Sequence, residues 1–106
     1  MILLTNNCEE VAARIAGHYG EMEEALQLQE ECAELIQAIS KHRRYRDSVT
    51  KYHLCEEMAD VLATMDRLIY LMGINTAGLR EIIRQKNQRE LERIEKRDQK
   101  KICSIG

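Results

Sequence analysis

The apolar residues between positions 54 and 72 recur at alternating intervals of four and three, and this repeat constrains the fold more than any other feature. They are Leu54, Met58, Val61, Met65, Leu68 and Met72. Such intervals place side chains on one face of an α-helix, and their alternation is typical of helices that pack lengthwise in bundles. The chain has no Pro to interrupt such a helix. A helix of about 24 residues is about 36 Å long, so the sequence predicts an extended packing surface.

Four helical segments are predicted, separated by Gly, Asn, Ser or Thr. They are expected at about residues 7–16, 21–42, from just after Ser48 to Met72, and 76–99. Asn6 or Asn7 is the expected N-cap of the first segment, and Ser48 is the expected N-cap of the third. Glycines at positions 17, 20 and 73 are the expected helix ends. Residues 100–106 show no clear pattern.

We therefore expect an all-α, four-helix domain that spans residues 1–106, with long antiparallel helices forming a bundle. A chain of 106 residues is of single-domain size. Helices this long in so short a chain leave more apolar surface than one copy covers well. The sequence therefore predicts that the bundle is completed by oligomerisation, as a dimer with a shared core.

Composition excludes several classes of protein. The formal charge of −2 and the pI near 5.9 provide no basic surface for duplex nucleic acid. Aromatic residues make up only 4% of the chain, too few for a groove that stacks single-stranded bases. No apolar run approaches the ~20 residues of a membrane span, and there is no signal-peptide pattern. The four cysteines lack the spacing of zinc ligands. We expect a cytoplasmic protein.

Two acidic pairs border the apolar stripes of the second and third segments. Glu31 and Glu34 form one pair, and Glu57 and Asp60 form the other; each pair is three residues apart, on one side of its helix. If the two helices are antiparallel neighbours, four carboxylates converge, and protonation or bound cations would relieve their repulsion. Ligands that are all oxygen favour Mg²⁺ or Mn²⁺ over zinc. The alternative is that both pairs are merely solvated helix faces.

The fourth segment has basic residues where its apolar pattern predicts Leu or Ile. Lys86 and Arg93 fall within the apolar face, and Arg89 lies at its margin. These three cations could hold phosphates, or Lys86 could reach out to water or pair with a glutamate. Residues 41–46 form a second basic cluster. Positive side chains there either interact with the negative end of the helix dipole, as is common at a helix C-terminus, or contact phosphate.

The acidic residues of the second and third segments resemble the sequence signature of a known family. Glu30-Glu31-x-x-Glu34, then 22 residues, then Glu57-x-x-Asp60 resembles the motif of the MazG-like all-α nucleoside triphosphate pyrophosphohydrolases. The texts EECAELIQAISK and EEMADVLATMDRLIYLMGI are similar to that family, and IIRQKNQRELERI resembles its basic segment. The resemblance covers roughly residues 24 to 97.

The resemblance implies Mg²⁺-dependent hydrolysis of a nucleoside triphosphate to a monophosphate and pyrophosphate by a homodimer or homotetramer. The implied metal ligands are Glu31, Glu34, Glu57 and Asp60. Glu30 and Glu31 are the implied catalytic residues, Glu30 as an aid to orienting water, and Lys86, Arg89 and Arg93 are the approximate phosphate-binding positions. Trp and Phe are absent, so the base preference stays open. Two alternative functions stay open: the protein is a phosphoribosyl-ATP pyrophosphohydrolase, or it is a non-catalytic helical module that binds nucleotides or other partners.

Overall fold

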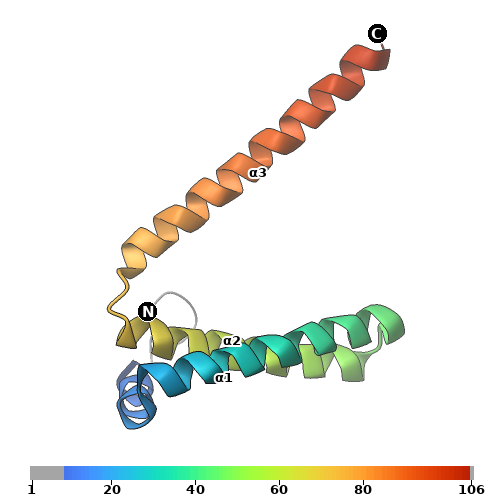
Figure 1. The fold of residues 1–106 in the computed structure, drawn as a ribbon. Helices are drawn as coiled ribbons and strands as arrows, with labels where there is room; N and C mark the ends of the chain where they lie inside the picture. Colours follow the sequence, from blue (N-terminus) through green and yellow to red (C-terminus); the bar gives the residue numbers. More distant parts are fainter. Residues whose placement is uncertain (1–8, 106) are drawn as a thin grey trace. The chain divides into compact units, whose positions relative to one another are not determined.

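All the secondary structure in the described residues is helical. A computed structural model describes residues 9–105, and within them the side chains of residues 10–103. These residues form α1 (Glu9–Tyr45), α2 (Ser48–Leu71) and α3 (Thr76–Ile105), with no strand among them (Figure 1). The predicted all-α class is therefore confirmed. None of the described helices is long and apolar enough to cross a membrane.

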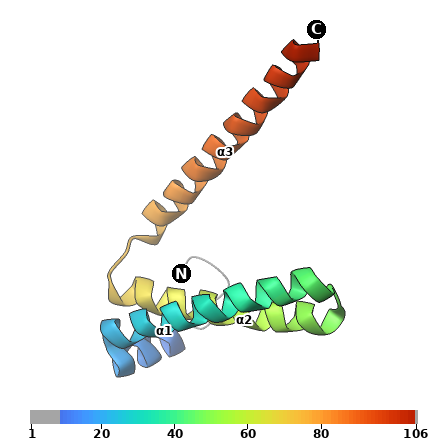
Figure 2. The ribbon, with the colours of Figure 1, turned by 45° about the vertical axis from the view of Figure 1, so that its right-hand side comes forward.

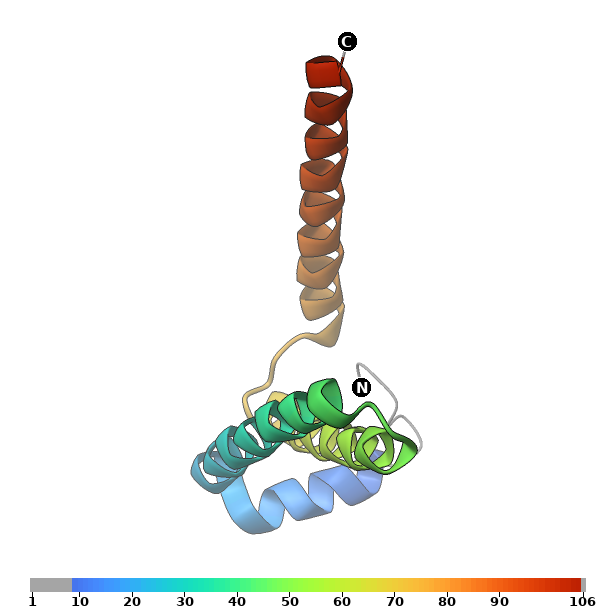
Figure 3. The same cartoon turned by 90° about the vertical axis from the view of Figure 1, so that its right-hand side faces the viewer.

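A break at Gly20 divides α1 into two helical segments. Gly20 has φ 85° and ψ 169°, a backbone conformation that residues with a Cβ rarely adopt. The segment before Gly20 runs across the α1–α2 pair rather than along it (Figure 3). The first two predicted segments are thus one element with a kink, and the helix does not end at Gly17. The second segment extends to Tyr45 instead of His42. The caps expected at Asn6 or Asn7 lie outside the described residues.

A tight turn joins α1 to α2, so that α2 returns antiparallel along the second segment of α1 (Figure 2). Asp47, not the predicted Ser48, is the N-cap of α2, because its Oδ1 accepts a hydrogen bond from the backbone N–H of Thr50 at 2.7 Å. The Thr50 hydroxyl also lies 2.9 Å from Nδ1 of His42 at the end of α1. These contacts fix the register in which the two helices meet.

The apolar core of this hairpin is small. Its buried apolar residues are Ala16, Ala38, Val61 and Ile69. Large apolar side chains of both helices stay exposed in a single chain: Ile36 on α1 is 65% exposed, and Met58, from the predicted stripe on α2, is 44% exposed. One described chain therefore leaves much of the predicted packing surface uncovered.

The described chain divides into two compact units, the first ending at Ile74 and the second beginning at Asn75. Gly73, with φ 63°, lies just beyond α2 as predicted. The second unit is α3, capped by Asn75, whose Oδ1 accepts from the backbone N–H of Gly78 at 3.1 Å. α3 continues to Ile105 rather than ending near residue 99, so the tail is helical through that residue. Three helical elements are thus described, and the four-helix bundle remains a prediction.

Candidate metal centre

Two rows of polar residues face each other across α1 and α2. The row on α1 is Glu24, Gln27, Glu31 and Glu34, and the row on α2 is Glu57, Asp60, Thr64 and Arg67. Both rows are spaced three, four and three, so each follows one side of its helix. Because the helices are antiparallel, the start of one row lies opposite the end of the other, as the Glu24–Arg67 ion pair shows. We call these eight residues the polar seam.

Four carboxylates meet in the middle of the polar seam. One oxygen from each of Glu31, Glu34, Glu57 and Asp60 lies within 4.8 Å of the others. The structure therefore brings together the four residues that the sequence selects as metal ligands. Their helical spacing explains this, since an i, i+3 pair on each of two antiparallel helices presents four oxygens to one point.

The acidic cluster is partly buried and incompletely satisfied. Glu57 is only 9% exposed, and Oε2 of Glu57 and Oε2 of Glu31 are buried without a hydrogen-bond partner among the described residues. The other Glu31 oxygen accepts a hydrogen bond from Nε2 of Gln27 at 2.7 Å. Desolvation by burial raises the pKa of Glu31, and the negative charges of Asp60 and Glu34 raise it further. A bound cation would offset the repulsion among these carboxylates.

The donor set fits a hard divalent cation. All four candidate ligands are carboxylate oxygens, the ligand type that Mg²⁺ and Mn²⁺ prefer, and the cluster contains no thiolate or imidazole. Glu31 and Glu57 each keep one buried oxygen without a hydrogen-bond partner among the described residues, while the other Glu57 oxygen, Oε1, lies 3.7 Å from Nε2 of His53. The residues present therefore fit the metal that the resemblance implies.

Four polar residues on the Glu24 side of the cluster, Glu24, Gln27, Thr64 and Arg67, extend the seam and were missed by the sequence interpretation. The guanidinium of Arg67 pairs with Glu24 and donates to the Thr64 hydroxyl at 3.3 Å. That hydroxyl in turn donates to the carbonyl oxygen of Asp60 at 2.8 Å. Their positions continue the three-and-four spacing by one heptad beyond each acidic pair, which is the signal that could have found them.

The remaining predicted site residues lie outside the acidic cluster. Glu30 is exposed on α1, one position before Glu31. Lys86, Arg89 and Arg93 are all exposed on α3, in the second unit, and Arg93 pairs with Glu90 at 3.1 Å. Their phosphate-binding role stays a prediction.

Comparison with protein families identifies a matching family. A family model described as the MazG nucleotide pyrophosphohydrolase domain matches residues 21–100. That range begins just after the kink at Gly20 and includes all four carboxylates of the cluster. Neither the comparison with curated proteins nor that with solved structures gives a match. Because the family model covers most of the 106 residues, the chain belongs to the MazG nucleotide pyrophosphohydrolase domain family.

Proposed function

We propose that this protein is a Mg²⁺-dependent nucleoside triphosphate pyrophosphohydrolase, which hydrolyses a ribo- or deoxyribonucleoside triphosphate to its monophosphate and pyrophosphate. The observation that carries the proposal is the acidic cluster, in which four carboxylates from two antiparallel helices lie within 4.8 Å of one another. Family membership supports the reaction class. Mn²⁺ offers the same coordination chemistry and should substitute for Mg²⁺.

The residues of the proposed site divide into groups with different tasks. Glu31, Glu34, Glu57 and Asp60 hold the divalent ion. When bound, that ion supplies a water of lowered pKa and neutralises charge on the phosphates. Glu30 helps to orient the attacking water, and the Gln27 amide fixes the Glu31 carboxylate through their 2.7 Å hydrogen bond. Lys86, Arg89 and Arg93 are proposed to bind phosphate from α3.

A pyrophosphate-release screen tests the proposal. Canonical and modified nucleoside triphosphates are incubated with the protein, with and without Mg²⁺, and we expect release of pyrophosphate only with the metal. Glu34→Gln and Asp60→Asn should each abolish turnover while the helical circular-dichroism spectrum is retained. Full activity in either variant would remove the assignment.

We also propose that the protein works as a homodimer or homotetramer. Large apolar side chains on both helices of the first unit are exposed, among them Ile36, Ile39 and Met58. In a single chain this surface faces water, which is costly for a contiguous apolar patch. Light scattering at micromolar concentration should therefore give a mass of two or four chains, and a monomeric mass would contradict this part of the proposal.

Two other functions make different predictions. A phosphoribosyl-ATP pyrophosphohydrolase would release pyrophosphate from that substrate in preference to nucleoside triphosphates. A non-catalytic helical module would bind partners without any Mg²⁺-dependent stabilisation. The buried unpaired oxygens of Glu31 and Glu57 favour the metal-dependent enzymes over such a module.

A further inference from the structure

The polar seam continues past the acidic cluster toward Glu24 and Arg67 and ends at Glu34 and Glu57 on the other side, and there is a pocket at each end. One pocket of about 260 Å³ is lined by Tyr19, Glu23, Glu24, Gln27 and Arg67. The other, of about 410 Å³, is lined by Lys41 and His53 together with Glu34 and Glu57 of the cluster. Along α1, Glu24 precedes Glu31 by seven residues and Lys41 follows Glu34 by seven, so each lies about 10 Å from the cluster.

The Glu24 pocket is polar but carries no spare positive charge. Glu24 is only 2% exposed, and its carboxylate is paired with the Arg67 guanidinium. A pyrophosphate placed there would meet a buried negative charge whose only cation is already engaged, and that is unfavourable. The pocket instead offers both hydrogen-bond donors and acceptors, from Gln27 and the Glu24–Arg67 ion pair, beside the exposed ring of Tyr19. These features suit an uncharged heterocycle and sugar.

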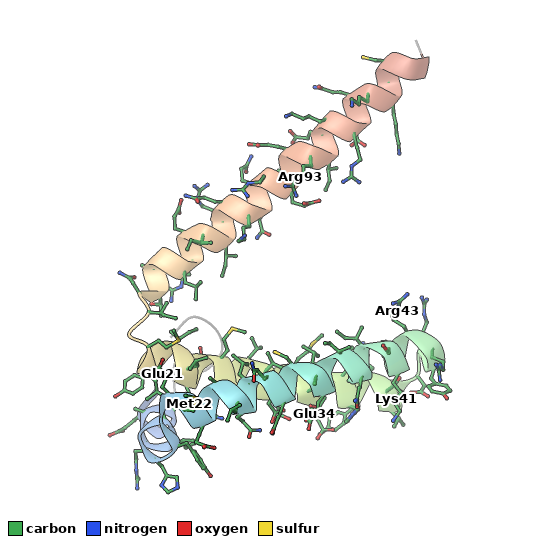
Figure 4. All side chains as sticks on the ribbon, viewed as in Figure 1. Glu21, Met22, Glu34, Lys41, Arg43 and Arg93 are labelled. Carbon is green, nitrogen blue, oxygen red and sulfur yellow. The ribbon has the colours of Figure 1, made fainter. Side chains whose placement is uncertain are left out.

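The Lys41 pocket has the opposite character. Figure 4 shows Lys41 and Glu34 projecting from the same side of α1, whereas Arg43 projects from the other side. None of the ion pairs recorded for the described residues engages Lys41. Its ammonium group is therefore available beside the cluster, and a lysine acts toward phosphate as a mobile point charge. Positive charge next to the candidate metal centre is what departing phosphates require.

We propose that the substrate lies lengthwise along the polar seam, with its nucleoside in the Tyr19–Glu24–Arg67 pocket and its terminal phosphates against Lys41. This inference rests on the proposed function and deepens it, because it assigns the direction of the substrate and two sets of contacts. Arg67 and Glu24 then form a specificity pair that reads the base, and Lys41 holds the leaving pyrophosphate.

Product binding tests the direction without relying on turnover. Inorganic pyrophosphate and a set of nucleoside monophosphates are titrated separately, in the presence of Mn²⁺, into the full chain and its variants by calorimetry. Lys41→Ala should weaken pyrophosphate binding about fivefold or more, the loss expected for a hydrogen bond to a charged group, and leave monophosphate binding within about twofold. Arg43→Ala, from the other side of α1, is the matched control and should change neither.

The nucleoside pocket needs a variant that folds, because Arg67→Ala would leave Glu24 buried without its cation. Tyr19 is 56% exposed, so Tyr19→Leu should fold normally. It should weaken monophosphate binding about fivefold or more, as loss of base stacking does, and leave pyrophosphate binding unchanged. The crossed pattern, or loss of both products in either variant, would overturn the assigned direction. Absence of Mn²⁺-dependent binding of either product by the unmutated protein would overturn the proposed function itself.

Discussion

Glu31→Gln should stabilise the metal-free protein and at the same time abolish its stabilisation by metal. The substitution keeps the shape of the side chain, and its carbonyl oxygen still accepts the hydrogen bond from Gln27. It removes one of four negative charges and replaces an unpaired buried oxygen with a donor that faces neighbouring carboxylates. Both changes favour the folded state in the absence of a cation.

The size of the effect follows from the cluster geometry. Two unit charges 4.8 Å apart repel by about 3.5 kcal/mol at an effective dielectric constant of 20, and by about 0.9 kcal/mol at that of water. Because Glu34 and Asp60 are exposed, the lower part of this range applies, and we expect a gain of about 1–2 kcal/mol. In a unit of this size, each kcal/mol corresponds to about 4–8 °C in melting temperature.

Metal should stabilise the unmutated protein but not the Glu31→Gln variant. A cation present at ten times its dissociation constant stabilises the unmutated protein by about 1.4 kcal/mol. Glu31→Gln loses one of the four ligands and should show little or no rise. Thermal melts followed by circular dichroism, in EDTA and in Mn²⁺, measure both effects. Glu56→Gln, an exposed glutamate next to Glu57, is the control and should resemble the unmutated protein in both buffers.

The reasoning fails if Glu31→Gln melts lower than the unmutated protein in EDTA, or if it keeps the full rise in Mn²⁺.

The stability of the metal-free protein should also depend on pH through Glu31. Since the pKa of Glu31 is raised above 4.5 in the folded protein, the metal-free stability due to protonated Glu31 is fully present below that pH. It is lost as the pH rises through the raised pKa. Stabilisation by metal should grow over the same interval, because the ligand must be ionised.

Three further predictions concern stability and are checked by thermal melts of the same protein. Gly20→Ala should destabilise by about 1 kcal/mol or more, because alanine is strained at φ 85°, whereas Gly17→Ala, at a helical position with open space around it, should be neutral or stabilising by up to about 1 kcal/mol. Asp47→Ala should cost about 1 kcal/mol through loss of the α2 N-cap, and an unchanged melting temperature would contradict that role. Arg67→Ala should cost about 3–5 kcal/mol by leaving Glu24 buried without its partner, and adding Glu24→Gln should recover part of that loss; no recovery would mean that the charge is not the cause.

The acidic cluster was largely predictable from periodicity. Once two segments are recognised as helices, an i, i+3 pair has a known direction, and a short connection makes the helices antiparallel neighbours. Residues Glu31, Glu34, Glu57 and Asp60 then meet in the register that the connection between α1 and α2 sets. The kink was half predictable: glycines mark the region, but only the structure shows that Gly20, and not Gly17, takes the left-handed conformation.

Other features depend on contacts that the sequence does not display. Asp47 and Ser48 are both good N-caps, and their side-chain geometry at the turn, together with the His42–Thr50 contact, decides between them. In the sequence, Glu24 is indistinguishable from the other acidic residues of a solvated helix face. Its burial follows from Arg67 on α2, 43 residues away, and a pairing at that distance emerges only from the register of the two helices.

The polar seam also explains why the apolar stripes are poorly buried. In a two-helix hairpin, the positions where the helices meet would normally hold Leu, Ile or Val, and their burial would supply the stability. Here six buried or half-buried positions of the seam are polar, and the buried apolar residues include two alanines, which bury little surface. The interface between α1 and α2 thus gives up hydrophobic stabilisation to create a charged groove. Anything that binds only the folded groove or covers the exposed apolar side chains must then stabilise the fold itself, so ligand binding, oligomerisation and folding form one linked equilibrium.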